Sequence, residues 1–175
     1  MGQLVNRLGP LLCPFELKGQ LVGVSDTGLL QTLACTAHQL GLKNYLFTHA
    51  SVGADEMLPF GTNQCWWVGE RSDRQWNEVV DSVGTPAVKG DLSRLRGGNA
   101  AENAQRLQRV LAADDCAEAI DAVTLNAGAA LLVAGQVTSV RQGVALAKEA
   151  LFSGAALNVL RRTQAFCRQL RVSAA

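Results

Sequence analysis

The chain has 175 residues, of which 48% are hydrophobic and 18% are charged, and its formal net charge is +1 at pH 7. This length predicts one domain with a sizeable core, and this composition excludes a wholly disordered chain. The near-neutral charge provides no overall field that would attract nucleic acid or a membrane surface. No uncharged apolar run approaches the roughly 20 residues that span a bilayer, so no membrane partner is expected.

The five cysteines are scattered along the chain and form neither a C-x-x-C motif nor a Cys/His cluster. This spacing argues against a zinc site. An odd number of cysteines without a signal peptide is typical of a reducing compartment, so we expect a cytoplasmic location.

The first part of the chain predicts a strand, a helix and a second strand. Prolines within 8–14 prevent a regular helix there, and the short apolar run 21–24 predicts a strand. Apolar residues at helical spacing predict a helix over 29–40, and the apolar run 45–48 predicts the next strand. A strand–helix–strand unit of this kind forms a right-handed parallel crossover.

The middle of the chain is less regular. The run 64–68 predicts a strand, in which Trp66 and Trp67 would point to opposite faces. A polar turn is expected over 70–74, and 76–83 is compatible with either a strand or a short helix.

The last part of the chain predicts four helices, over 100–111, 117–134, 140–152 and 155–170. Asn99 can cap the first of them, and Glu102 has the spacing of a capping box. The alanines and Gly128 of the second allow another backbone to approach closely. The whole pattern predicts a single α/β domain over 1–175, with a partial, mostly parallel sheet flanked by helices in three layers and a helical carboxyl-terminal part.

Two adjacent acids, Asp55 and Glu56, follow the expected buried strand over 45–47 and the turn residue Gly53. This places them on the loop that leaves the carboxyl end of a strand, where open α/β sheets bind their ligands. Neighbouring carboxylates suit Mg²⁺, which takes one or two carboxylates together with substrate phosphates. The simpler alternative is a solvated turn.

Several short motifs follow one another in a fixed order, over 6–14, 20–24, 53–56, 95–103, 121–130 and 143–149. Their order and spacing resemble the carboxyl-terminal half of the anthranilate phosphoribosyltransferase family. The matching family patterns are N-x-L-G-P-L-x-N-P, Q-x-L-G-V, G-x-D-E, L-R-G-G-D-A-A-E-N-A and D-A-V-x-L-N-A-A-A-A-L. The resemblance implies a truncated catalytic domain of the nucleoside phosphorylase and phosphoribosyltransferase type.

The resemblance also implies a reaction, the transfer of phosphoribosyl from phosphoribosyl pyrophosphate to anthranilate in tryptophan biosynthesis. By position, Asp55 and Glu56 match the acids that bind the accompanying Mg²⁺, and Gly9, with Pro10 beside it, matches the glycine at the anthranilate site. Mg²⁺ neutralises charge on the leaving pyrophosphate, and holding the amine near the ribose C1 carbon supplies much of the acceleration. A glycine lets a flat aromatic acid approach the backbone.

Other residues of these motifs favour structural roles. The Gly97-Gly98 pair predicts a tight turn into a capped helix rather than a phosphate site, although a helix start can bind anions. Asn126 is interpreted as a buried hydrogen-bonding residue and His38 as solvent-facing. His49 is compatible with a general base, but a hydrogen-bonded structural histidine is favoured.

The resemblance fails in one large respect and several small ones. The family's helical domain, its G-T-G-G-D loop and the arginine that pairs with anthranilate have no counterpart here, so we expect the chain alone to be inactive. A sheet without its partner strands exposes apolar surface, which predicts a homo-oligomer, a swapped assembly or a missing partner. Cys13 and Asn99 replace a family asparagine and aspartate, and the histidine before the acids is displaced.

Two further functions stay open. A non-catalytic paralogue could act as an assembly or nucleic-acid-binding module, because the last helix has arginines at helical spacing, namely Arg161, Arg162, Arg168 and Arg171. Such binding would weaken steeply with salt, although a solvated helix face is the simpler interpretation. A nucleoside phosphorylase relative is the third alternative, which the Leu-Gly-Pro and Gly-x-Asp-Glu motifs disfavour.

Overall fold

The computed structural model describes residues 8–69, 78–81 and 90–173. Its strands are β1 (Gln20–Gly23), β2 (Tyr45–Ala50), β3 (Thr62–Val68) and β4 (Glu78–Asp81). Its short 3-10 helices are η1 (Gly9–Leu11) and η2 (Leu92–Leu95), and its α-helices are α2 (Thr27–Gln39), α3 (Ala100–Leu111), α4 (Ala117–Val133), α5 (Val140–Phe152) and α6 (Ala155–Ser173).

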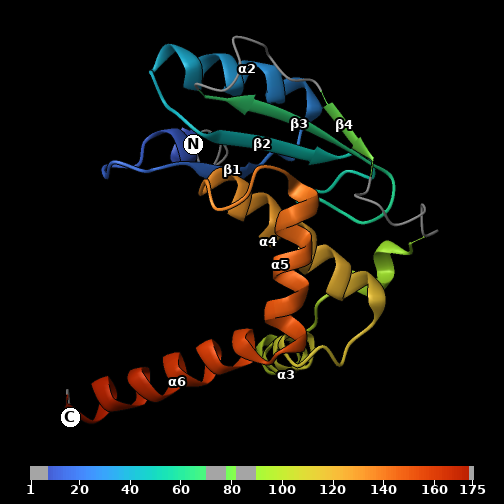
Figure 1. Ribbon diagram of the computed structural model, residues 1–175, viewed down its shortest axis with the longest axis vertical. Helices are drawn as coiled ribbons and strands as arrows, with labels where there is room; N and C mark the ends of the chain where they lie inside the picture. The colour runs from blue at the N-terminus through green and yellow to red at the C-terminus, as the bar shows by residue number, and fades with distance from the viewer. Residues whose placement is uncertain (1–7, 70–77, 82–89, 174–175) are drawn as a thin grey trace.

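The four strands form one sheet in the order β1-β2-β3-β4 (Figure 1). β1 and β2 are parallel, as the strand–helix–strand pattern predicts, whereas β3 is antiparallel to both β2 and β4. The α/β class is therefore confirmed, but within the described residues the sheet is mixed rather than mostly parallel. The reason is the connection 51–61 between β2 and β3, which lacks the helical crossover that parallel neighbours require. The polar turn expected over 70–74 lies outside the described residues.

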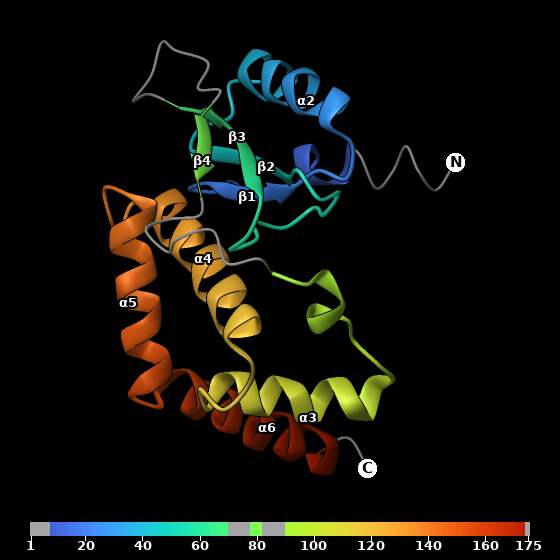
Figure 2. The same cartoon turned by 90° about the vertical axis from the view of Figure 1, so that its right-hand side faces the viewer.

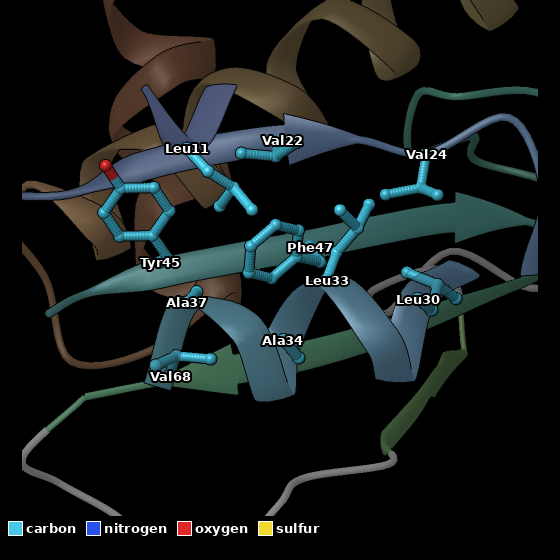
Figure 3. Close-up of a cluster of buried hydrophobic side chains, with 10 residues drawn as sticks. All are labelled: Leu11, Val22, Val24, Leu30, Leu33, Ala34, Ala37, Tyr45, Phe47 and Val68. Carbon is cyan, nitrogen blue, oxygen red and sulfur yellow. The ribbon is translucent and has the colours of Figure 1, made fainter. Parts of the chain in front are cut away.

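Helices cover both faces of the sheet, which confirms the three-layer arrangement. α2 packs on one face, where Phe47, Leu30 and Ala37 lie in a buried apolar cluster (Figure 3). α4 packs on the other face, where Leu46 of β2 contacts a second cluster that includes Leu125. All six residues of β2 are buried because the strand lies between these two layers.

The two adjacent tryptophans confirm the alternation of β3. Trp66 packs against the cluster under α2, and Trp67 packs against the cluster on α4. Both side chains are half-buried, and together they cover the two sides of the sheet.

The helix ends follow local rules. Asp26 caps α2 by accepting a hydrogen bond from the backbone N–H of Gly28 at 3.0 Å. The capping box of α3 is complete, because Asn99 accepts from the N–H of Glu102 at 3.1 Å and the Glu102 carboxylate accepts from the N–H of Asn99 at 2.8 Å. Ser139 accepts from the N–H of Gln142 at 3.2 Å and caps α5.

α4 and α5 lie side by side (Figure 2). Gly128 and Gly143 meet at their contact. A Cβ atom added to Gly143 would lie 2.4 Å from the carbonyl oxygen of Gly128. The close approach that the alanines and Gly128 predict is therefore present.

α3 and α6 lie at the end of the molecule away from the sheet (Figure 2). Residues 161–170 of α6 are all exposed. Among the described residues, no single helix is long and apolar enough to cross a bilayer. α5 and α6 meet that length and composition only as a pair, which is bent by 63°.

Candidate functional site

The acid pair lies on the loop that leaves the carboxyl end of β2, as the sequence predicts. Asp55 and Glu56 are both exposed. The loop turns back on the strand, because the N–H of Gly53 donates to the carbonyl of Ala50 at 2.8 Å and the N–H of Ala50 donates to the carbonyl of Ala54 at 2.9 Å. Gly53 adopts a positive φ of 89°, which a glycine provides without strain.

The same loop also lies directly against the end of β1. A Cβ atom added to Gly23, the last residue of that strand, would lie 1.7 Å from the carbonyl oxygen of Asp55. Only a glycine therefore permits this approach, and it places the acid pair where β1 and β2 both end. The sequence alone does not reveal this role of Gly23, although a glycine in a strand can mark close backbone approach.

His49 lies beneath this edge and is only 5% exposed. Its Nδ1 atom is 2.7 Å from the carbonyl oxygen of Val24. Because a carbonyl oxygen can only accept, Nδ1 bears the proton, and the ring joins β2 to the segment that follows β1. The geometry fits the structural histidine that the sequence favours, while His38 is exposed on α2 as expected.

The donor set of the loop fits Mg²⁺. Within the described ranges, no group of three or more His, Cys, Asp or Glu side chains could hold a metal ion. Two adjacent exposed carboxylates suit a hard cation that takes its other ligands from substrate phosphates and water. They do not suit a closed zinc site, which needs four protein ligands of the nitrogen and sulfur type.

Gly9 and Pro10 lie on a different element, the 3-10 turn η1. Gly9 is exposed, and a Cβ atom added to it would meet nothing within 4 Å. Leu11 anchors the turn, because its side chain is buried in the cluster that contains Tyr45 (Figure 3). No atom of the described residues therefore requires a glycine at position 9, and its open face stays available to a ligand.

The glycine pair before α3 forms a structural turn. The side chain of Asn103 accepts a hydrogen bond from the N–H of Gly98 at 2.8 Å and donates one to its carbonyl at 2.9 Å. This bidentate contact holds the turn against the helix, which agrees with the structural interpretation of Gly97-Gly98.

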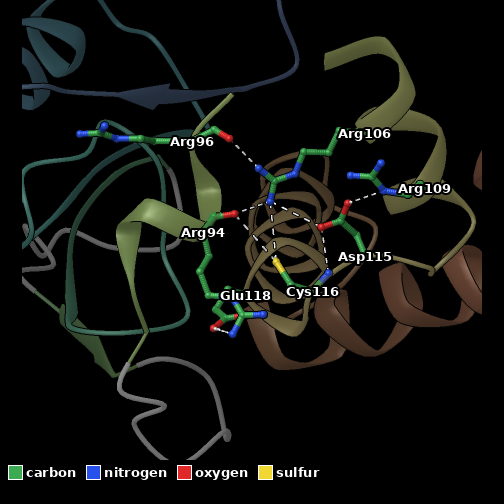
Figure 4. A network of polar contacts seen from close by, with 7 residues as sticks. All are labelled: Arg94, Arg96, Arg106, Arg109, Asp115, Cys116 and Glu118. Carbon is green, nitrogen blue, oxygen red and sulfur yellow. Dashed lines mark hydrogen bonds and ion pairs between the residues drawn. The ribbon is translucent and has the colours of Figure 1, made fainter. Parts of the chain in front are cut away.

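A basic cavity of about 550 Å³ lies beside that turn, and its lining includes Arg94, Arg96, Arg106, Arg109 and Asp115. Arg106 donates to the carbonyl of Arg96 at 2.7 Å and also to the carbonyl of Arg94 (Figure 4). Burial alone would raise the pKa of Asp115, but hydrogen bonds from Cys116 and the charge of Arg106 outweigh it and hold that pKa below its ordinary value. The Arg106 guanidinium therefore joins η2, α3 and the start of α4.

Three of the arginines predicted on the last helix, Arg161, Arg162 and Arg168, lie exposed on α6. The helix contains no Asp or Glu. Its binding to nucleic acid stays a prediction.

Comparison with known proteins gives a consistent result. The chain is 37% identical over 161 residues to anthranilate phosphoribosyltransferase of Exiguobacterium sibiricum, which covers 92% of this chain and 47% of that protein. It is 38% identical over 159 residues to the Brucella canis enzyme of the same name, covering 91% and 46%. The chain thus spans about half the length of the curated relatives it matches.

Solved structures show the same fold. The anthranilate phosphoribosyltransferase of Thermus thermophilus superposes with a TM-score of 0.71 at 35% identity, over 83% of this chain and 42% of that one. The Saccharomyces cerevisiae enzyme in complex with phosphoribosyl pyrophosphate and Mg superposes with a TM-score of 0.72 at 23% identity, over 88% and 43%. The latter likeness concerns the fold alone.

The family model described as "Glycosyl transferase family, a/b domain" matches residues 2–157, which is most of the chain. That match agrees with the identity to the bacterial relatives and with the shared fold. The chain therefore belongs to the glycosyl transferase family, a/b domain.

Proposed function

We propose that the chain supplies the Mg²⁺-binding part, and some of the acceptor-binding part, of a phosphoribosyltransferase that transfers phosphoribosyl from phosphoribosyl pyrophosphate to anthranilate. The observation that carries this proposal is the exposed acid pair, which Gly23 allows to lie where β1 and β2 end. The names of the bacterial relatives support the reaction. The yeast complexes with phosphoribosyl pyrophosphate and Mg, and with 4-fluoroanthranilate, support the ligand classes.

In this proposal Asp55 and Glu56 hold Mg²⁺ through their carboxylates, on a loop that the sheet edge fixes in place. When bound, Mg²⁺ neutralises charge on pyrophosphate oxygens. The loop holds the two carboxylates in position, because its backbone is fixed before the reaction and need not become ordered during it. The free face of Gly9, with Pro10 beside it, lets the planar amine approach η1.

We further propose that this chain does not complete the reaction by itself. It matches less than half the length of the bacterial relatives, and two carboxylates provide no donor for the phosphate groups. The remaining phosphate and acceptor contacts would come from the part of the relatives that this chain does not match.

All five cysteines lie within the described residues and none forms a disulfide, which agrees with the expected cytoplasmic location.

Isothermal titration of phosphoribosyl pyrophosphate with Mg²⁺ tests the site directly. We expect the chain to bind and the double variant Asp55→Ala, Glu56→Ala to bind at least about tenfold more weakly, because the metal ligands are gone. Asp114→Asn is the control, since Asp114 is exposed and belongs to the other pair of adjacent acids. Equal binding by the chain and the double variant would refute the proposed site.

We also propose that the chain self-associates through its helical end. Large apolar side chains are exposed on α3, α5 and α6, namely Leu107, Leu146, Phe152, Val159, Phe166 and Leu170. Exposed apolar side chains that gather into one patch mark an interaction site, and we propose that several of these do so. Light scattering should give a mass above that of one 18.6 kDa chain, and Phe166→Glu should lower it. A constant single-chain mass over a wide range of concentration would contradict the proposal.

A further inference from the structure

Two asparagine side chains each form a pair of hydrogen bonds to the backbone immediately after the acid pair. The amide of Asn126, on α4, accepts a hydrogen bond from the N–H of Met57 at 3.1 Å and donates one to the carbonyl of Met57 at 2.7 Å. Its second N–H donates to the carbonyl of Ala122 at 2.9 Å, one turn earlier in the same helix. Both donors of the amide are used, so its orientation is fixed.

The next residue is held in the same way from the sheet. The amide of Asn63, on β3, accepts from the N–H of Leu58 at 2.8 Å and donates to the carbonyl of Leu58 at 2.8 Å. Asn63 is 0% exposed and Met57 is 0% exposed. Because water cannot replace its partners in a buried position, the Asn63 contact is costly to break. Asn126 is half-buried rather than buried as the sequence suggests, and its contacts to Met57 are part-buried.

We propose that Asn63 and Asn126 act as positioning residues for the Asp55-Glu56 pair, through a double amide clamp on Met57 and Leu58. This inference rests on the proposed function, in which the pair binds Mg²⁺. The clamp fixes the chain on the carboxyl side of the acids. The contact of Gly23 with the Asp55 carbonyl, and the hydrogen bond between Ala50 and Ala54, fix it on the amino side.

The clamp is needed to hold the geometry of the metal ligands, because the side chains of the acids are exposed. Metal ligands must be held within about 0.5 Å of their working geometry, and exposed side chains cannot provide that restraint alone. Residues that orient metal ligands from behind typically contribute roughly 10- to 100-fold to metal affinity. Here the restraint comes from two layers at once, since Asn126 belongs to the helix under the sheet and Asn63 to the sheet itself.

The chain offers a matched control for this clamp. Asn103 makes the same bidentate contact, to Gly98, but on α3 at the end of the molecule away from the sheet. Asn126→Ser and Asn103→Ser each remove one such contact. The serine is too short to reach both backbone atoms. Asn126→Gln is a second variant that keeps the amide but displaces it by one methylene, should the serine variant fail to fold.

Two readouts on the full chain separate the clamp from the metal site. The first is amide hydrogen exchange over 54–58, which reports the clamp without any metal. The second is the affinity for Mn²⁺ with inorganic pyrophosphate, followed by electron paramagnetic resonance. We expect Asn126→Ser to speed exchange over 54–58 and to weaken Mn²⁺ binding roughly tenfold. Asn103→Ser should speed exchange at Gly98 and leave both readouts at the acid pair unchanged.

The outcomes distinguish the two proposals. Unchanged exchange over 54–58 in both Asn126 variants would overturn the clamp, whatever the metal does. Faster exchange with unchanged Mn²⁺ affinity would also overturn it, because the positioning role would be absent. If the parent chain and the Asp55→Ala, Glu56→Ala variant bind Mn²⁺ equally, the proposed metal site fails and the positioning role fails with it, while the exchange data still show whether the clamp holds the loop.

Discussion

Replacing Gly23 by alanine is expected to displace the acid-pair loop and to destabilise the fold by about 1–3 kcal/mol, the usual effect of forcing extra atoms into a packed position. The added Cβ atom would lie 1.7 Å from the carbonyl oxygen of Asp55. That oxygen belongs to the backbone and cannot rotate away, so the whole loop must move. Urea unfolding measures the loss of stability. Titration with phosphoribosyl pyrophosphate and Mg²⁺ measures the affinity for this ligand, which should fall because the acids are displaced.

Gly28→Ala is the control for this experiment. The added atom at position 28 meets only the exposed carboxylate oxygen of Asp26, at 3.3 Å, and this side chain, which caps α2, needs to shift by only a few tenths of an ångström. It should leave both stability and ligand binding close to those of the parent. A Gly23→Ala variant as stable as the parent, with unchanged binding, would show that the loop does not lie against the end of β1.

A second large effect is expected at the contact between α4 and α5. Alanine at position 143 would bring a Cβ atom to 2.4 Å from the carbonyl oxygen of Gly128 and 2.7 Å from its Cα atom. In a helix that tolerated it, the same change would stabilise by up to about 1 kcal/mol, because alanine is the better helix former. We expect the opposite sign, a loss of about 1–3 kcal/mol, because the two helices must separate.

Thermal unfolding followed by circular dichroism tests this prediction, and Gly28→Ala again provides the comparison within a helix. The separation should also move Asn126, since that residue lies on α4 two residues before Gly128. Gly143→Ala should therefore speed amide exchange over 54–58 as well. A variant with raised stability would mean that α4 and α5 do not cross at these glycines.

The sequence predicts the local features of this fold well, because their causes lie within a few residues. The capping box of Asn99 and Glu102 is complete at its expected spacing. The position of Asp55 and Glu56 beyond a buried strand also follows from local pattern alone. Their exact side-chain roles as metal ligands, and those of Gly9 and Pro10 toward an acceptor, stay predictions.

The features that the sequence does not predict depend on distant partners. The direction of β3 depends on a loop, 51–61, that contains no two-residue hairpin motif, so the sequence does not predict the antiparallel pairing of β3 with β2. Gly23 meets Asp55 across 32 residues of chain, and Arg106 ties together segments that share no motif. Periodicity describes each element separately, and it does not show which backbone lies against which.

The hydrogen bonds of Asn126 have a consequence for the order in which the molecule is made. Met57 and Asn126 are 69 residues apart. During synthesis, chains emerge from the ribosome amino terminus first, so the acid-pair loop is made and exposed well before α4 exists to hold it. β1, α2, β2 and β3 can assemble early, with Asn63 already in place on β3. The loop acquires its final geometry only when α4 docks, so an element that is translated later completes the position of the acid pair.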